Sequence, residues 1–360
     1  MSLSIGIVGL PNVGKSTLFN ALLKQQVALA ANYPFATIEP NVGIAQVPDS
    51  RLPVLAEVVH TTTIKPATVE FVDIAGLVKG ASQGAGLGNQ FLSHIRETAA
   101  ICHVLRAFSD NDIIREGAVN PMEDLATIRT ELQLADLATL EKQSPPKGAA
   151  KPGEAERWQT VIYLKQQLET GAFLSQLHLT PTQEHVAKEL SLLSSKPELF
   201  ILNVDEDQVG QSAALTAEYV PQLKVAASQI VVVSAKIESE LAVLSAEDQQ
   251  LYLQDLGLDK SGLERLAEAA YATLGLQSFL TAGEKEVRAW TIKKGMTAPE
   301  AAGVIHTDFT KKFIKAQVAD YADFVALKGW KGVREVGKLR IEGRDYVMKE
   351  GDVVEFAIGA

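Results

Sequence analysis

A glycine-containing loop that ends in Lys-Ser is the first chemical feature of the sequence. Residues 9–16 read GLPNVGKS, which matches GxxxxGK[ST], and they lie between an apolar run and the helix-forming segment TLFNALL. The two glycines let backbone N–H groups curl around phosphate oxygens, and the helix N-terminus adds the positive end of its dipole. Lys15 is expected to reach the β- and γ-phosphates of a nucleotide, and the Ser16 hydroxyl to bind Mg²⁺. The flanking strand and helix favour this reading over an ordinary glycine-rich turn.

Three further motifs stand at the ends of apolar runs or in the loops between them. VDIAG supplies Asp73, whose carboxylate can hold Mg²⁺ through water, and Gly76, whose N–H can meet a γ-phosphate. PFATIEPN supplies Thr37, a hydroxyl that can complete the Mg²⁺ shell. VVVSAK supplies Ser234 and Ala235, where a backbone N–H can contact a base. Each motif is weak alone, but their order along the chain predicts a nucleotide-binding domain with Lys15 and Gly76 as its catalytic groups.

The stretch LFILNVDEDQ, residues 199–208, contains the loop that is expected to read the base. Asn203, Val204, Asp205 and Glu206 stand where a guanine-reading loop has Asn, Lys, any residue and Asp. Val204 has no lysine stem to pack on the base, and Glu206 sets its carboxylate one methylene further out. Adenine has a lone pair where guanine has an N–H, so we expect ATP to bind in preference to GTP. The alternative is an acidic loop without a role in base choice.

The nucleotide-contacting side chains and backbone groups are therefore predicted at both ends of the ligand. Asn203 and the backbone of Val204 are placed at the base. The complete predicted set is Asn12, Val13, Gly14, Lys15, Ser16, Thr17, Asn203, Val204, Glu206, Ser234 and Ala235. The predicted metal ligands are Ser16, Thr37 and Asp73.

Composition sets the class of protein to which these motifs belong. The 360 residues are 46% apolar and 22% charged, which is typical of a globular chain with two or three domains. Cys102 is the single cysteine, so an intramolecular disulfide is excluded and a cytoplasmic location is expected. We expect no signal peptide and no membrane segment. The net charge is −10, but residues 281–360 carry 14 basic and 12 acidic side chains, which indicates either a solvated surface or a basic face for RNA.

The order of apolar runs and helical patterns predicts the architecture. Short β-branched runs alternate with helical segments, which is typical of an α/β fold with a doubly wound, mainly parallel sheet. A helical hairpin is expected between two of these strands, where it either packs on its own sheet or docks a partner, and a small α+β module follows. The predicted divisions are 1–120 and 198–280 for the nucleotide-binding domain, 121–197 for the inserted helical arm and 281–360 for the C-terminal module. Thr180 and the pair Thr297 and Glu300 are predicted helix caps.

The sequence resembles the Obg-like P-loop ATPases, the YchF family, within the translation-factor-related GTPase class. The resemblance covers nearly the whole chain and is carried by GIVGLPNVGKSTLFNAL, PFATIEPN, FVDIAGLVKGAS, GLGNQFL, ILNVDE, EVRAWTI, AAGVIHTDF and EGRDYVMKEGDVVEF. It implies a P-loop domain, an inserted helical arm, a C-terminal β-grasp-like TGS domain, ATP preferred over GTP, and association with the ribosome, its large subunit or ribosomal RNA.

The hydrolytic mechanism is less well defined by the residues. Leu77 follows the DxxG motif where many regulatory GTPases have a water-orienting Gln, so slow turnover is expected. Arg115 stands where family members tend to carry His; it is either a charge stabiliser or a surface arginine. His103 is expected to be a core histidine. Residues 79–90 are expected to form a switch that γ-phosphate orders, or an idle linker. In related P-loop proteins an asparagine at the position of Asn12 helps to seat K⁺, while the alternative is a loop-stabilising side chain.

The combined prediction is a switch protein that binds MgATP, hydrolyses it slowly and contacts the ribosome. A GTPase of the same fold and a nucleotide-gated adaptor with incidental hydrolysis are the alternatives. A monomer is compatible with the sequence, which does not decide the oligomeric state.

Overall fold

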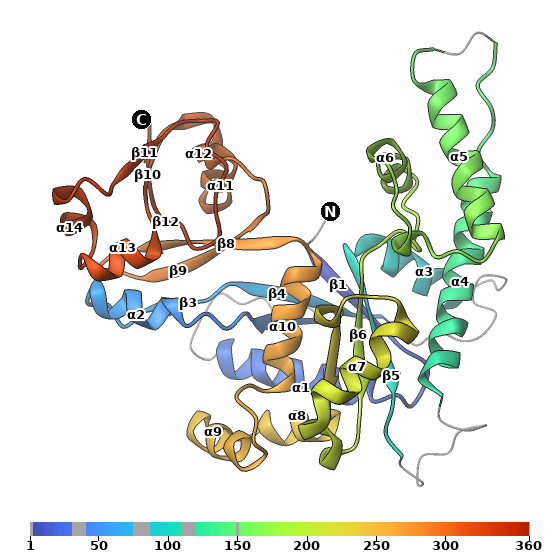
Figure 1. Ribbon diagram of the computed structural model, residues 1–360, viewed down its shortest axis with the longest axis horizontal. Coiled ribbons are helices and arrows are strands. Elements are labelled where there is room, and N and C mark those ends of the chain that lie inside the picture. Colours follow the sequence, from blue (N-terminus) through green and yellow to red (C-terminus); the bar gives the residue numbers. More distant parts are fainter. Residues whose placement is uncertain (1–2, 31–40, 75–86, 110–119, 149–150, 360) are drawn as a thin grey trace. The chain divides into compact units, whose positions relative to one another are not determined.

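The computed structural model describes residues 3–30, 41–74, 87–109, 120–148 and 151–359 (Figure 1). The chain divides into two compact units. The first consists of Met1–Ala45 and Glu70–Ala270, and the second of Gln46–Val69 and Tyr271–Ala360. Among the described residues, none of the helices combines the length and the apolar composition that crossing a membrane requires.

The first unit is built on a mainly parallel six-stranded sheet, as predicted. The strand order is β2-β4-β1-β5-β6-β7, and β1 pairs in parallel with both β4 and β5, β5 with β6, and β6 with β7. All residues of β1, β5, β6 and β7 are buried, which requires helices on both faces of the sheet. The strands are β1 Ser4–Val8, β2 Val42–Gln46, β4 Thr68–Asp73, β5 Ala100–Arg106, β6 Glu198–Asn203 and β7 Ile230–Val233.

Two apolar clusters lie on one face of the sheet and join it to some of the helices of this unit. In β5, Ile101 belongs to a cluster with Phe91 and Ile128, whereas Leu105 packs with Phe200 and its neighbours. Ile101 and Leu105 are four residues apart, so both lie on the same side of the strand. The helices that follow the sheet strands are α1 Lys15–Ala30, α3 Leu87–Glu97, α7 Ser212–Leu223, α8 Ala235–Leu241, α9 Ala246–Asp255 and α10 Gly262–Thr273.

The predicted helical arm is formed by α4 Pro121–Glu141 and α5 Glu154–Glu169, which lie side by side and extend from the sheet (Figure 1). Asn120 caps α4, because its side chain accepts hydrogen bonds from the backbone N–H groups of Met122 and Glu123. The helix α6, Pro181–Glu189, follows and packs on α5. It begins with a capping box between Thr180 and Gln183, which confirms Thr180 as its N-cap.

The arm is tied to the body of the first unit by a buried carboxylate on α4. Asp136 is fully buried and accepts hydrogen bonds of 2.8 Å from the backbone N–H groups of Leu193 and Ser194, and one of 2.5 Å from the Ser194 hydroxyl. Burial disfavours the charged form and raises the pKa of Asp136, while these three donors oppose the shift. The contact fixes the middle of α4 against the chain that leads into β6.

The second unit contains a mixed six-stranded sheet with the order β11-β10-β12-β8-β9-β3. Within it, β8 and β9 form an antiparallel hairpin, β12 lies parallel to β8, and β10 is antiparallel to both β12 and β11. This order with a helix packed on the sheet is the topology of a β-grasp fold. The elements are β8 Leu276–Ala282, β9 Val287–Lys293, α11 Ala298–Ile305, α12 Thr307–Lys312, β10 Phe313–Ala319, α13 Tyr321–Ala326, α14 Trp330–Glu335, β11 Arg340–Glu342 and β12 Val353–Ile358.

The segment 46–69 belongs to the second unit, which differs from the predicted assignment of residues 1–120 to the nucleotide-binding domain. Its strand β3, Ile64–Lys65, pairs in parallel with β9 and forms the sixth strand of the sheet. Its helix α2, Arg51–Val58, packs near β9 and α13, and Arg51 forms ion pairs with Asp49 and Glu350. Backbone pairing and ion pairs between distant parts of the chain therefore determine this boundary.

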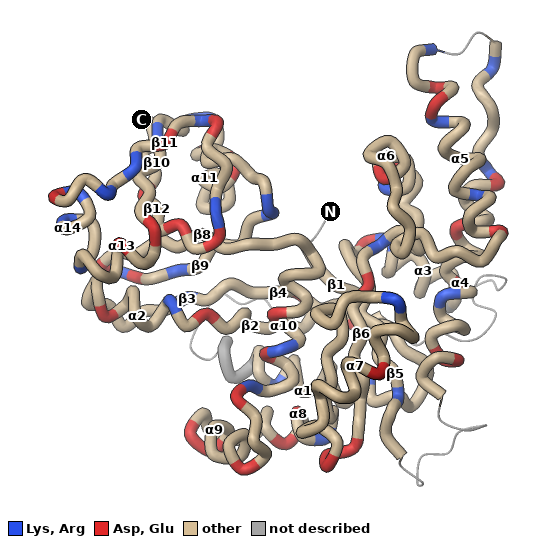
Figure 2. Tube along the Cα trace, in the orientation of Figure 1, with Lys and Arg blue, Asp and Glu red and all other residues tan. Residues whose placement is uncertain are grey.

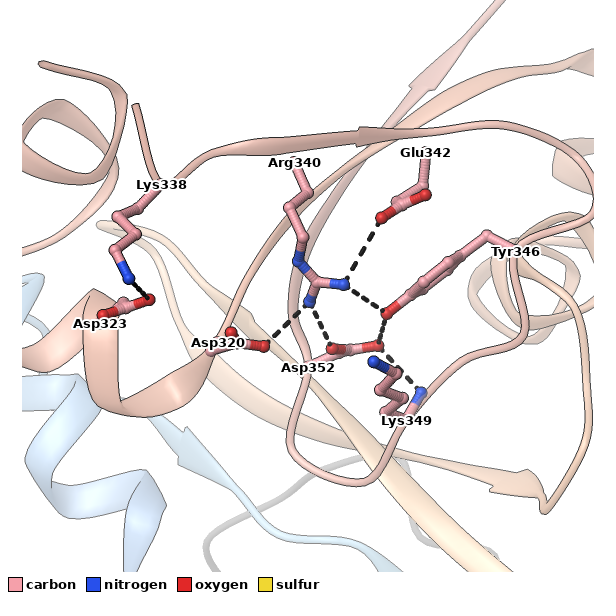
Figure 3. Close-up of polar contacts among 8 residues, drawn as sticks. All are labelled: Asp320, Asp323, Lys338, Arg340, Glu342, Tyr346, Lys349 and Asp352. Atoms are coloured by element: carbon pink, nitrogen blue, oxygen red, sulfur yellow. Dashed lines mark hydrogen bonds and ion pairs between the residues drawn. The ribbon is translucent and has the colours of Figure 1, made fainter. Parts of the chain in front are cut away.

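A polar cluster fixes the short edge strand β11 (Figure 3). Arg340 donates hydrogen bonds to Asp320 at 2.9 Å, to the Tyr346 hydroxyl at 3.0 Å and to Asp352 at 3.2 Å. The Tyr346 hydroxyl in turn donates to Asp352 at 2.9 Å. Burial raises the pKa of Tyr346 to about 12, so the hydroxyl stays protonated as a donor. The cluster holds the loop before β12 against β11, whose three residues offer few backbone hydrogen bonds of their own.

The helix α11 begins with part of the predicted capping box. The Glu300 carboxylate accepts hydrogen bonds from the Thr297 backbone N–H at 2.7 Å and from the Thr297 hydroxyl at 2.8 Å. These bonds lower the pKa of Glu300 below its ordinary value. The spacing in the sequence thus identified the start of this helix correctly.

Candidate nucleotide site

The loop Gly9–Ser16 connects β1 to α1 in the conformation that a phosphate cradle requires. Asn12 and Gly14 have positive φ angles of 63° and 90°, and this left-handed conformation turns successive backbone N–H groups toward one side. A Cβ at Gly14 would lie 2.1 Å from the Asn203 amide nitrogen, and one at Gly9 would lie 2.8 Å from Val13. Close packing favours glycine at both positions, and at Gly14 the positive φ angle favours it as well.

Lys15 and Asp73 meet at the carboxyl edge of the sheet. The Lys15 ammonium forms an ion pair with the Asp73 carboxylate, and both side chains are mostly buried. Lys15 opens α1, and Asp73 ends β4, the strand next to β1. Ser16 and Thr17 follow in the first turn of α1 and are exposed. The arrangement brings one cation, one carboxylate and two hydroxyls to the helix N-terminus, where phosphate oxygens and a divalent cation are favoured.

Asn203 joins three loops of the site through both ends of its side-chain amide. Its nitrogen donates a 2.9 Å hydrogen bond to the carbonyl of Val13 in the P-loop. Its oxygen accepts a 2.9 Å hydrogen bond from the backbone N–H of Ala235, at the start of α8. Asn203 is 4% exposed, so these bonds form in a buried environment. One N–H of the amide remains for a further acceptor, such as a ring nitrogen of a base.

The side chains after Asn203 are divided between the core and the exposed loop. Val204 is 3% exposed and packs in the apolar cluster with Leu105, and its backbone N–H donates a 2.9 Å hydrogen bond to the carbonyl of Val233. Asp205 accepts 3.0 Å hydrogen bonds from the backbone N–H and the hydroxyl of Ser109. Glu206 forms an ion pair with Lys236, the residue after Ala235. The acidic loop is thus held by specific partners, and its Glu206 carboxylate lies next to the end of β7.

Several predicted site residues fall outside the described part of the chain. They are Thr37, Gly76, Leu77 and Arg115, together with most of the expected switch at residues 79–90. From Leu87 onward that stretch is described, and it forms the start of α3. The described residues bring together Asn12, Val13, Gly14, Lys15, Ser16, Thr17, Asp73, Asn203, Val204, Glu206, Ser234 and Ala235 around the carboxyl edge of the sheet.

His103 is a core residue, as expected, but it belongs to a buried charged network. It is fully buried, stacks on Phe200 with ring centroids 5.1 Å apart, and lies 2.9 Å from the Glu198 carboxylate. Arg129 of α4 binds the same carboxylate through two nitrogens at 2.8 and 3.1 Å. Burial raises the pKa of Glu198, but His103 and Arg129 outweigh it, so the pKa stays below its ordinary value. This network anchors the base of the arm at the opposite end of β6 from Asn203.

Two features of the site were not identified from the sequence. Lys236 was part of the quoted motif VVVSAK, but its ion pair with Glu206 was not anticipated. The double role of Asn203 in joining the P-loop to Ala235 was also missed. The order of the strands could have indicated both contacts. Because β6 and β7 are neighbours, the loops that follow their carboxyl ends must lie close together.

Comparisons with known proteins agree with this geometry. Residues 4–140 match the family model described as "50S ribosome-binding GTPase", and residues 276–359 match the YchF-GTPase C-terminal family, described as "Protein of unknown function (DUF933)". The ribosome-binding ATPase YchF of Bacillus subtilis is 49% identical over 366 residues, with 99% of each chain covered. The chain belongs to the YchF family. The YchF protein of Escherichia coli O157:H7 is likewise 49% identical over 363 residues, with 99% of each chain covered.

The fold also agrees with a solved member of the YchF family. The structure of the Schizosaccharomyces pombe YchF GTPase matches with a TM-score of 0.85 and 36% sequence identity, covering 99% of this chain and 97% of that one. The resemblance inferred from the motifs is therefore confirmed, and it extends through both units. The fold class, a P-loop α/β sheet with a further C-terminal domain, is confirmed as well.

Proposed function

We propose that this protein is a switch that binds MgATP, hydrolyses it slowly and associates with the ribosome through its large subunit or ribosomal RNA. The joint position of the P-loop, Lys15 and Asp73 is the observation that carries the nucleotide part of the proposal. The names of the two bacterial relatives, ribosome-binding ATPase YchF, support the rest. A ribosomal partner would place the protein in the cytoplasm, as its single cysteine also suggests.

The metal part of the proposal rests on the donors around the start of α1. Mg²⁺ in such sites takes one or two protein ligands and completes its shell with water and phosphate oxygens. The Ser16 hydroxyl and the Asp73 carboxylate fit this requirement, and Thr37 is the third proposed ligand. Bound metal would supply charge neutralisation at the phosphates. Asp73 would then exchange its contact with Lys15 for the metal shell, and Lys15 would turn toward the phosphates. A K⁺ ion beside Asn12 is a further proposal.

The preference for ATP follows from the residues at the proposed base site. The remaining N–H of Asn203 suits a ring nitrogen that adenine and guanine share, so it does not discriminate between them. Discrimination by a guanine reader depends on a carboxylate that accepts two hydrogen bonds from the base. Here Glu206 is longer than that Asp and is engaged by Lys236, while the side chain of Val204 lies in the core. The loop therefore lacks the groups that would favour guanine.

A single substitution tests this account of base choice. Glu206→Asp shortens the side chain to that of a guanine reader, and we expect it to raise the GTP affinity relative to ATP by about tenfold, equal to about 1.4 kcal/mol. Competition between labelled ATP and each unlabelled nucleotide gives the ratio. Glu206→Gln is the matched control, because it keeps the length but cannot accept both hydrogen bonds, and it should not favour GTP. An unchanged ratio of GTP affinity to ATP affinity in Glu206→Asp would show that Glu206 takes no part in base recognition.

The ribosomal part of the proposal assigns the contacts to the arm and the second unit. The second unit, proposed here as a TGS-like domain, exposes a set of lysines that suit phosphate-rich RNA. These are Lys293, Lys294, Lys311, Lys312, Lys315, Lys328 and Lys331. The assignment of nucleotide binding and ribosome contact to separate domains stays a proposal. The predicted domains are 1–120, 121–197, 198–280 and 281–360, and residues 46–69 are grouped in the second unit.

Sedimentation with purified ribosomes tests this association. With Mg²⁺ and ATP at low salt, the protein is expected in the ribosomal pellet, and raising the salt should release it because phosphate contacts displace counterions. Separated subunits show whether the large one suffices. A protein that stays in the supernatant under all nucleotide conditions would contradict the ribosomal proposal. A GTPase of the same fold, which the names of the matched family and of the solved Schizosaccharomyces pombe protein favour, is distinguished by nucleotide competition.

A further inference from the structure

The segment after α8 exposes apolar side chains that have no role in the proposed nucleotide site. Val243 is 66% exposed, Leu251 61% and Leu244 37%. Single exposed apolar residues are normal, but three within nine positions of one segment indicate an interaction site. Leu251 lies on α9 between Glu247 and Asp255, each one helical turn away, so an exposed leucine is flanked by carboxylates on the same face.

The charge of this segment has a single sign. Between Ile237 and Asp259 the sequence contains six acidic residues and no basic residue. Figure 2 shows acidic and no basic positions along α9. Glu238 is buried and caps α10 through the backbone N–H groups of Gly262 and Leu263, whereas the other five are exposed or partly exposed. We define the α8–α9 patch as Glu240, Val243, Leu244, Glu247, Asp248, Leu251 and Asp255.

The packing of α9 does not account for the exposed side chains. No residue of α9 is fully buried, and the helix uses Tyr252 and Leu253 to contact the core cluster. Tyr252 also donates a 2.8 Å hydrogen bond to Glu240, and the Gln249 amide donates to the carbonyl oxygens of Leu241 and Leu244. These contacts fix α9 through one face and leave Leu251 on the other. The residues of the patch on α9 therefore lie on a helix whose position is fixed by its contacts with the rest of the first unit.

A groove next to the patch gives an elongated ligand a place to lie. It is a shallow hollow of about 680 Å³ between α1 and α8. Val243 belongs both to the groove and to the patch, so the two are continuous. The groove is lined by Thr17, Asn20, Leu23, Lys24, Ser239, Ala242 and Val243, and its lining surface is mainly apolar.

We propose that the α8–α9 patch and its groove bind a basic, amphipathic segment of a partner protein. The carboxylates of the α8–α9 patch would repel RNA phosphates and anionic lipid head groups, whereas they attract lysine and arginine side chains. The apolar residues Val243 and Leu251 need an apolar counterpart, which a helix with one leucine-rich face supplies. The partner is therefore a polypeptide with cationic and apolar faces. This interaction is independent of the proposed ribosome association.

A designed peptide tests the surface directly. The probe is a fluorescent helix of about four turns with leucines on one face and lysines on the other, and its binding to the full chain is followed by anisotropy. A peptide of the same pattern with glutamate in place of lysine is expected to bind at least about tenfold more weakly. The variant Glu247→Lys/Asp255→Lys should weaken binding of the lysine peptide by about tenfold, and so should Val243→Ser/Leu251→Ser.

Two matched controls separate this site from general attraction to an acidic protein. Glu141→Lys/Glu169→Lys changes the net charge by the same amount on the arm, where both side chains are exposed, and it should leave peptide binding within about twofold of the original. Val336→Ser removes a 61% exposed apolar side chain from the second unit and should have no effect. Equal loss in the arm variant, no loss in the patch variants, or no binding of the lysine peptide would each overturn the proposal.

Discussion

Replacing Lys15 by methionine is expected to reduce ATP turnover by about a hundred- to thousandfold, because the substitution removes a cation aimed at the charge that develops on the phosphates. Lys15 lies at the start of α1 in an ion pair with Asp73, which it would exchange for the phosphates when a nucleotide binds. Methionine keeps most of the side-chain volume and should preserve the fold. The release of phosphate in the presence of Mg²⁺ measures the effect.

The control for this experiment is Lys165→Met on the exposed side of the arm. Lys165 forms two ion pairs with exposed glutamates, at 3.6 and 3.7 Å. Exposed ion pairs of this kind contribute little to stability. Its loss should leave turnover unchanged. The loss of a phosphate contact of this kind costs about tenfold or more in rate. If Lys15→Met retained more than about half of the original rate, the assignment of Lys15 as a catalytic group would therefore be wrong.

Replacing Asn203 by leucine is expected to lower the free energy of unfolding of the first unit by about 2–4 kcal/mol. The substitution leaves the Val13 carbonyl and the Ala235 N–H buried without their partners. The same change should weaken nucleotide binding by about tenfold or more, because the P-loop and the loop after β7 lose their common support. Urea unfolding and nucleotide titration measure the two effects.

Asn20→Leu provides the comparison for Asn203→Leu. Asn20 lies on α1, a short distance after the P-loop, and is exposed, so the same chemical change should cost less than about 0.5 kcal/mol there. Equal stability of the two variants would show that the hydrogen bonds of Asn203 contribute no net stabilisation. Loss of stability without loss of nucleotide affinity would restrict Asn203 to a role in folding.

The parts of the fold that depend on local signals could be predicted from the sequence. The motif GLPNVGKS located the P-loop because its glycines and lysine serve one local geometry. Thr180 identified a helix start because a cap acts within one turn. His103 was placed correctly in the core because it occurs within an apolar strand.

Contacts between distant parts of the chain could not be predicted in this way. Residues 46–69 looked like a continuation of the nucleotide-binding domain, yet β3 pairs with β9, more than two hundred residues further along. The carboxylate of Glu198 gave no local indication of its contacts with His103 and Arg129. The same holds for Glu206 and Lys236, which meet only because β6 and β7 are neighbours.

Competition between ATP and GTP for the unmodified protein is the most direct test of the central claim. With Mg²⁺ present, labelled ATP is bound first and is then displaced by either unlabelled nucleotide. We predict that ATP displaces the label at a concentration at least about tenfold lower than GTP does, because the loop Asn203–Glu206 lacks a guanine-specific acceptor. Displacement by GTP at a lower concentration than by ATP would contradict the account and make GTP the preferred nucleotide.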